Sequence, residues 1–178
     1  MRRSAIQAEL RQSRPFRSTA QEATIALLRT ASVINRVIER AVEPFDLSLS
    51  QYNALRIVRG AGPHGIATLA IRERMIEEGT PITRVLDRLE ERGYVRRDRG
   101  TDRRQVLCVI TKHGAELLAR MDPIVNAADE EAMTALSADE LETLIALMDA
   151  IRLDNTDRGA PRTMRTRESG LPSGAVDE

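Results

Sequence analysis

The 178-residue chain has few of the residues on which catalytic, metal-binding and disulfide-stabilised proteins depend. It contains one cysteine, two histidines and no tryptophan, and aromatic residues make up only 2% of it. A single cysteine excludes an internal disulfide framework. No stretch has the apolar length of a membrane span, and the N-terminus has no apolar signal core. We therefore expect a soluble, cytoplasmic protein without a membrane partner.

The same scarcity argues against an enzyme. His64 lies in a glycine-rich turn and His113 at an expected helix start, and neither has a cysteine or carboxylate at metal-ligand spacing. The sequence has no glycine-rich phosphate loop and no nucleophile elbow. Cys108 alternates with Val106 and Ile110, which is typical of a small buried side chain in a strand rather than of a redox sensor. We expect no catalytic residue, no metal and no cofactor.

The most informative segment is 80–111, where a helix, a strand, an arginine-rich turn and a second strand are expected with almost no linker. Thr80 is placed to cap the helix, Pro81 to occupy its first turn, and Gly93 to end it. Apolar residues at i, i+3, i+4 and i+7 give this helix a face for a core: Ile82, Val85, Leu86 and Leu89. Strands are expected at 94–97 and 105–111. This order of elements indicates a winged helix.

Charge is distributed very unevenly along a chain whose net charge is zero. Between Thr80 and Lys112, nine basic residues face five acidic ones; between Met121 and Asp157, ten acidic residues face one arginine. A charge run is usually no more than a solvated surface. Here, however, the cationic part coincides with the expected winged helix and is separated from the anionic part, which favours a DNA-binding face.

The central segment resembles the MarR family of bacterial transcriptional regulators. T-P-I-T-R-V-L-D-R-L-E-E-R-G-Y-V-R-R is similar to that family's recognition helix and first wing strand, and D-R-R-Q-V-L-C-V-I-T-K-H-G to its wing tip, second strand and next helix. The resemblance covers about residues 19–153, with a slightly longer link before the recognition helix at 71–79. It implies a mainly α fold with a small β-hairpin wing, and a homodimeric DNA-binding regulator, most often a repressor.

The rest of the chain is expected to be helical, with irregular ends. Residues 1–18 carry five arginines without a clear period, which indicates a flexible basic arm, and residues 156–178 are too polar to order themselves. Ser50 is placed to cap the first helix of the winged unit. A long helix is expected after the winged unit, and Pro123 within it should kink or split it. The expected domain at 19–155 contains the winged helix at about 48–112 and dimerisation helices at about 19–43 and 113–155.

A second feature points to self-association. Ser137 and Glu140 form a capping box that opens a terminal helix with a narrow apolar stripe. The stripe consists of Leu141, Leu144, Ile145, Met148 and Ile151. It would pack either within its own chain or on a second protomer. The winged unit is nearly complete without it, and the resemblance also implies a homodimer, so we expect the second arrangement.

Candidate DNA contacts follow from the winged helix. Arg84 and Arg88 lie one turn apart on the exposed helix face and are expected to contact base edges or nearby phosphates. Residues at the helix start should contact phosphate or a base edge, and the arginines of the wing tip should enter the minor groove. The full set is Thr80, Pro81, Thr83, Arg84, Arg88, Asp102, Arg103 and Arg104, with Asp102 orienting one guanidinium of the tip.

An effector is implied by the resemblance alone. In the resembled family, small aromatic acids or drugs often bind between the dimerisation helices and the DNA-binding lobe. The corresponding wall here would include Phe45, Tyr52 and Arg56. Two alternatives stay open: a winged helix that binds an acidic protein partner, and a DNA-binding regulator without an effector.

Overall fold

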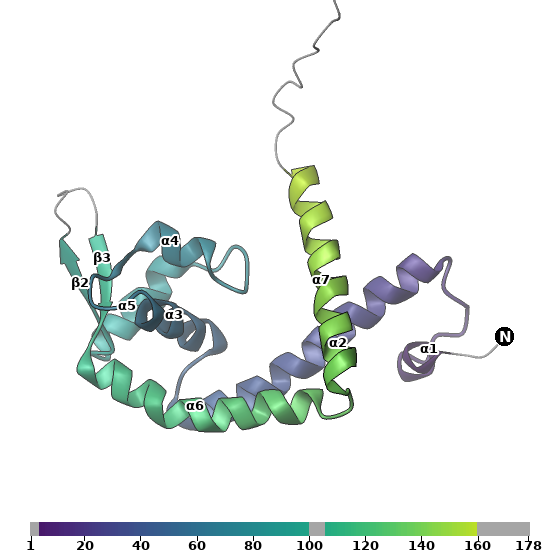
Figure 1. The fold of residues 1–178 in the computed structure, drawn as a ribbon, viewed down its shortest axis with the longest axis horizontal. Helices are drawn as coiled ribbons and strands as arrows, with labels where there is room; N and C mark the ends of the chain where they lie inside the picture. Colours follow the sequence, from purple (N-terminus) through teal and green to yellow (C-terminus); the bar gives the residue numbers. More distant parts are fainter. Residues whose placement is uncertain (1–3, 100–105, 160–178) are drawn as a thin grey trace, which may run out of the picture. The chain divides into compact units, whose positions relative to one another are not determined.

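The computed structural model describes residues 4–99 and 106–159 (Figure 1). The chain divides into two compact units, Met1–Thr134 and Ala135–Glu178. Within the described residues, the first unit contains helices α1 to α6 and a small sheet, and the second contains helix α7. None of the helices in this described part is long and apolar enough to cross a membrane.

A small lobe of the first unit has the expected winged-helix elements. Its helices are α3 (Leu49–Gly60), α4 (Thr68–Glu73) and α5 (Ile82–Glu91), which gather beside the strands in Figure 1. The antiparallel sheet has the order β1-β3-β2, with strands Ile66–Ala67, Val95–Arg99 and Val106–Ile110 for β1, β2 and β3. The mainly helical fold with a small β wing is confirmed. Strand β1 was not expected, because two residues are too short to show a period.

Burial in this lobe follows the apolar pattern of α5. The four residues expected to enter the core, Ile82, Val85, Leu86 and Leu89, are all buried, the last two completely. Helix α5 packs on α3 and β2. Its opposite face is therefore left to solvent, as an amphipathic helix on the surface of a small domain requires.

Two helix starts differ from expectation. Helix α3 is capped by Ser48 rather than Ser50: Ser48 Oγ accepts a 3.2 Å bond from the amide of Gln51, and Gln51 Oε1 accepts a 2.8 Å bond from the amide of Ser48. Helix α5 has Pro81 at its N-cap, without a side-chain cap. Thr80 does not cap it, because its hydroxyl donates to the Glu77 carbonyl at 2.8 Å. The capping prediction for Thr80 is therefore wrong.

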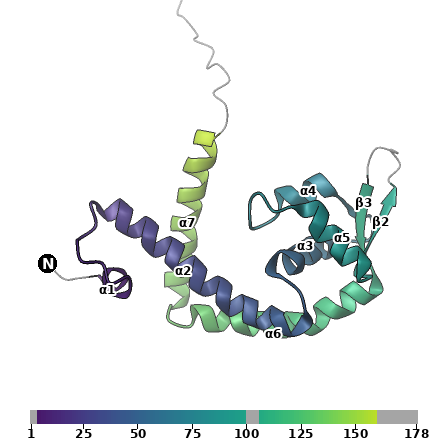
Figure 2. The same cartoon turned by 180° about the vertical axis from the view of Figure 1, so that it is seen from behind.

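Two long helices, α2 (Thr19–Val42) and α6 (Lys112–Met133), lie side by side in both views of the ribbon (Figures 1 and 2). Helix α2 runs into a short 3-10 helix, η1 (Glu43–Phe45). Helix α6 is continuous through Pro123, so the expected split does not occur. Near its start, a Cβ on Gly114 would lie 2.2 Å from the Tyr94 carbonyl oxygen, so only glycine allows α6 to approach the wing this closely.

Two described segments that were expected to be irregular are helical. Residues Ala5–Glu9 form helix α1, and Glu9 Oε1 accepts a 2.7 Å bond from Arg29 Nε of α2, so this part of the expected flexible arm is folded. Helix α7 spans Ala138–Gly159 and passes position 156, where the tail was expected to begin.

The capping box at the start of α7 is confirmed. The Ser137 amide donates to Glu140 Oε2 at 2.8 Å, and the Glu140 amide donates to Ser137 Oγ at 3.4 Å. Hydrogen bonds from the Ser137 amide and hydroxyl lower the pKa of the Glu140 carboxyl.

Candidate nucleic-acid interface

The solvent face of α5 presents most of the expected recognition residues. Pro81, Thr83, Arg84 and Arg88 are exposed, whereas Thr80 is only 8% exposed. Within the described residues, the side chains of Arg84 and Arg88 make no intramolecular hydrogen bond or ion pair. Because the two guanidinium groups lie one turn apart on the same face, they are available together to an external anion.

Other arginines near α5 are already engaged. Arg97 Nη2 donates to Asp87 Oδ1 at 2.6 Å, and Arg92 Nη2 lies 3.2 Å from Asp46 Oδ2. Arg96 pairs with Asp98 on its own strand. A guanidinium that is paired with a carboxylate of the same chain attracts an external anion less strongly. The structure thus separates Arg84 and Arg88 from the arginines that hold the lobe together.

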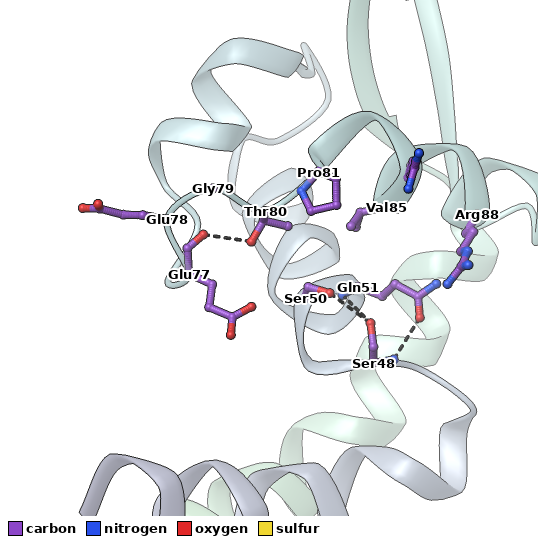
Figure 3. A pocket seen from close by; sticks show the side chains of 11 residues that line it. Ser48, Ser50, Gln51, Glu77, Glu78, Gly79, Thr80, Pro81, Val85 and Arg88 are labelled. Carbon is purple, nitrogen blue, oxygen red and sulfur yellow. Dashed lines mark hydrogen bonds between the residues drawn. The ribbon is translucent and has the colours of Figure 1, made fainter. Parts of the chain in front are cut away.

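A hollow of about 400 Å³ lies between the start of α3 and α5, the expected recognition helix (Figure 3). Figure 3 shows Glu77 and Glu78 on one side of it and Arg88 on the other. Its lining residues are Ser48, Ser50, Gln51, Glu77, Glu78, Gly79, Thr80, Pro81, Arg84, Val85 and Arg88. The hollow is therefore lined by two cationic side chains, Arg84 and Arg88, and two anionic ones, Glu77 and Glu78. The sequence contains this signal, E-E-G shortly before α5, but the hollow that these residues share with Arg84 and Arg88 is visible only in the fold.

The segment carrying these two carboxylates, residues 76–79, is called the acidic turn below. Its backbone is held at both ends. Asn53 Oδ1 of α3 accepts a 3.0 Å bond from the Ile76 amide, and the Glu77 carbonyl accepts the bond from Thr80 described above. Gly79 has φ +79°, a left-handed conformation that glycine adopts without strain. The acidic turn thus has a fixed place beside α5.

The wing tip is the part of the predicted interface that lies outside the described residues, since Asp102, Arg103 and Arg104 all fall there. Strands β2 and β3, which lead to the tip, pair in register from Val95 opposite Ile110 to Arg99 opposite Val106. The tip residues therefore stay predictions from the sequence.

The three effector candidates do not form an open wall. Tyr52 is 6% exposed, and its pKa is raised by burial. Arg56 is exposed and has its guanidinium carbon 5.6 Å from the centre of the Tyr52 ring, and Phe45 is half-buried against the core. A separate hollow of about 620 Å³ lies near η1, lined by Arg36, Glu39, Arg40, Glu43, Asp46, Leu47, Ser48, Leu49 and Gln51. None of the three candidates lines it.

The predicted dimerisation stripe lies on α7. Leu141, Leu144 and Met148 are half-buried, while Ile145 and Ile151 are 54% and 49% exposed. A stripe that retains this much apolar exposure on one helix is available for burial against another chain.

Cys108 has the environment expected of an inert thiol. It is completely buried in β3, and burial raises the pKa of its thiol. No group of three or more histidine, cysteine or acidic side chains in the described part of the chain is arranged to hold a metal ion.

Sequence comparison decides the family. Residues 47–106 match the model of the MarR family, and the transcriptional regulator HosA of Escherichia coli O157:H7 is 34% identical over 104 residues, which are 58% of this chain and 76% of HosA. The chain belongs to the MarR family. It is therefore a DNA-binding transcriptional regulator rather than an enzyme.

Solved MarR-family structures have the same architecture. A MarR transcription factor from Planctomyces limnophilus is 39% identical, with a TM-score of 0.59 over 76% of this chain and 99% of that one. A mutant of MarR from E. coli, solved in complex with operator DNA, is 26% identical, with a TM-score of 0.65 over 71% of this chain and 90% of that one. These two structures agree with the winged lobe described above.

Proposed function

We propose that this MarR-family protein is a homodimeric repressor that reads a pseudo-palindromic operator with two α5 helices in successive major grooves. The observation that carries the proposal is the pair of unpartnered, exposed arginines on α5 in the described part of the chain. Phosphate and guanine both present acceptors that match the planar guanidinium fork. The complex of a related MarR mutant with operator DNA supports the same use of the lobe.

We assign different roles to residues on this face. Arg84 is nearer the helix start and is the candidate for base-edge contact, with Arg88 one turn later for a base edge or phosphate. Thr83 and Pro81 are exposed and border the backbone of the DNA. Thr80 is withdrawn from the set, because it is buried and its hydroxyl already holds the acidic turn.

The wing contributes the second part of the proposal. Asp102, Arg103 and Arg104 follow the family's pattern of a wing that enters the minor groove. Release by a small aromatic effector is also part of the proposal, and Phe45, Tyr52 and Arg56 stay its candidate wall. Tyr52 is buried, and the Arg56 guanidinium lies over its ring. For an effector to contact the Tyr52 ring, the Arg56 side chain would have to move away from it.

The test uses the DNA upstream of the gene and a randomised duplex of equal length. The wild-type chain should protect an inverted repeat in the upstream DNA, and Arg84→Ala combined with Arg88→Ala should abolish that protection. If the double variant binds the repeat as the wild type does, α5 is not the reading helix. Failure of the wild type to distinguish the two duplexes would favour the alternative of a protein-interaction module.

A further inference from the structure

Helix α3 is positioned between the part of the protein that is expected to dimerise and the part that reads DNA. On one side it packs against α5, and on another against α6. Its residues Ala54, Leu55 and Val58 are completely buried in the lobe core. Tyr52, Arg56 and Arg59 recur at i, i+4 and i+7, so they share a different face of the helix. Helix α3 therefore contacts both α6 and α5.

The contact between α3 and α6 includes a hydrogen-bonded ion pair with a defined geometry. Arg59 donates two hydrogen bonds to Asp122 of α6, at 2.6 Å from Nη1 to Oδ2 and at 3.1 Å from Nη2 to Oδ1. The two side chains are only 36% and 35% exposed. The hydrogen bond to Asp122 raises the pKa of the Arg59 guanidinium. A paired fork fixes orientation as well as distance, which non-directional apolar packing does not.

The surroundings reinforce this pair. Leu118, Met121 and Val125 of α6 are buried on either side of Asp122 in the sequence. Burial raises the pKa of Tyr52; the charges of Asp122 and Asp129 act in the same direction, and those of Arg56 and Arg59 oppose it. Acidic residues of α6 thus lie near the Tyr52 and Arg59 side of α3, and the bidentate pair joins the two helices there.

We propose that Arg59 and Asp122 are positioning residues that set the orientation of the winged lobe on α6, and thereby the half-site spacing that the dimer accepts. This inference rests on the proposed function, since two half-sites must be read together. Recognition helices of such dimers contact half-sites about one DNA turn apart, roughly 34–36 Å, so a small rotation of each lobe changes the preferred spacing.

The variant Arg59→Lys tests this with the full-length protein. Lysine keeps the positive charge but has no planar fork for a bidentate contact. The control is Arg29→Lys, which alters a one-bond contact to Glu9 away from this joint. The probe is the duplex that the wild type enriches from a randomised pool, together with versions whose half-sites are moved apart or together by a few base pairs.

Arg59→Lys should remain dimeric and should keep the salt dependence of binding, because the phosphate contacts are unchanged. Its preference for the enriched spacing should fall roughly fivefold or more relative to the altered spacings, in the range of coupling between linked sites. The charge exchange Arg59→Asp with Asp122→Arg should restore part of that preference, whereas either exchange alone should not.

Two results would overturn the inference. If Arg59→Lys loses thermal stability or affinity but keeps the full spacing preference, the pair is merely structural. If the wild type shows no spacing preference, no spacing is set and the joint has no such role, which also removes the two-half-site part of the proposed function. A third outcome separates the two proposals. If the Arg84→Ala and Arg88→Ala double variant loses binding but Arg59→Lys keeps its spacing preference, the proposed function is retained and only the role of the Arg59–Asp122 pair is rejected.

Discussion

Arg97 of β2 and Asp87 of α5 are joined by a 2.6 Å hydrogen bond between Nη2 and Oδ1. Arg97 Nη1 also lies 3.6 Å from Glu90 Oε2, so one guanidinium connects the wing strand to two carboxylates of the recognition helix. The Arg97 side chain is 25% exposed. Arginine in this lobe therefore occurs in two environments: Arg97 fixes the wing to α5, whereas Arg84 is exposed and is the residue that we propose for DNA contact.

Asp87→Asn should loosen this connection without unfolding the lobe. The change removes the negative charge from a hydrogen bond that is partly shielded from water, so the free energy of unfolding should fall by about 1 kcal/mol. Urea denaturation measures it. Glu116→Gln is the control, because its partner Lys112 is almost fully exposed and the pair should contribute little. Equal effects of the two substitutions would show that the Arg97 contact has no special structural role.

Arg84→Ala should reduce sequence discrimination while leaving stability unchanged. A guanidinium that contacts a base edge contributes roughly 1–3 kcal/mol of discrimination at that base pair. Binding to a set of single-base variants of the operator gives the profile, with Arg120→Ala on α6 as an exposed arginine away from the interface. A uniform loss of affinity for every duplex would instead identify Arg84 as a phosphate contact.

Glu77→Gln and Glu78→Gln should each strengthen binding to non-specific DNA. The acidic turn lies across the hollow from Arg88, so its carboxylates add negative charge to the surface where phosphates would approach Arg84 and Arg88. Because exposed charge pairs are worth roughly 0.2–1 kcal/mol, affinity should rise by about two- to fivefold. Titrations with random duplex measure it, with Glu142→Gln on α7 as control. Unchanged affinity would place the acidic turn away from the DNA backbone.

Much of the fold could be predicted because its signals are periodic. The apolar residues of α5 repeat over two turns, and all of them enter the core. The helix expected at about 19–43 corresponds to α2, which begins at Thr19 and ends at Val42. The capping box of α7 is a local motif whose partners lie three residues apart. Such features depend on neighbouring residues and are therefore visible in the sequence.

The features that could not be predicted depend on contacts between distant residues. Thr80 is an exception, because its hydroxyl bonds to the Glu77 carbonyl only three residues earlier, a local alternative to capping that the residue type does not distinguish. Strand β1 exists only through its pairing with β3, where Ile66 lies opposite Cys108. The Arg59 and Asp122 pair joins residues 63 positions apart. No local pattern indicates that Arg59 pairs with Asp122 or that residues 66–67 form a strand.

Cys108 should react slowly with thiol reagents in the folded protein. Only the thiolate is nucleophilic, and burial raises the pKa of this thiol, so the reactive fraction at a mildly alkaline pH is smaller than for a free cysteine. Labelling with iodoacetamide should be much slower than labelling of glutathione and should accelerate in urea. Rapid labelling of the native protein would indicate an accessible thiolate and would reopen the possibility of redox sensing.

Leu144→Asp should weaken the proposed homodimer. If the stripe on α7 packs against the N-terminal helix α2 of the partner protomer, the substitution buries a carboxylate without a counter-charge, at a cost of roughly 3–5 kcal/mol. Light scattering should then show a monomer that binds the operator only weakly, because one recognition helix reads one half-site. Ala146→Asp is the control, since Ala146 is exposed and lies outside the stripe. A folded Leu144→Asp monomer that still bound the operator tightly would show that two linked recognition helices are not required.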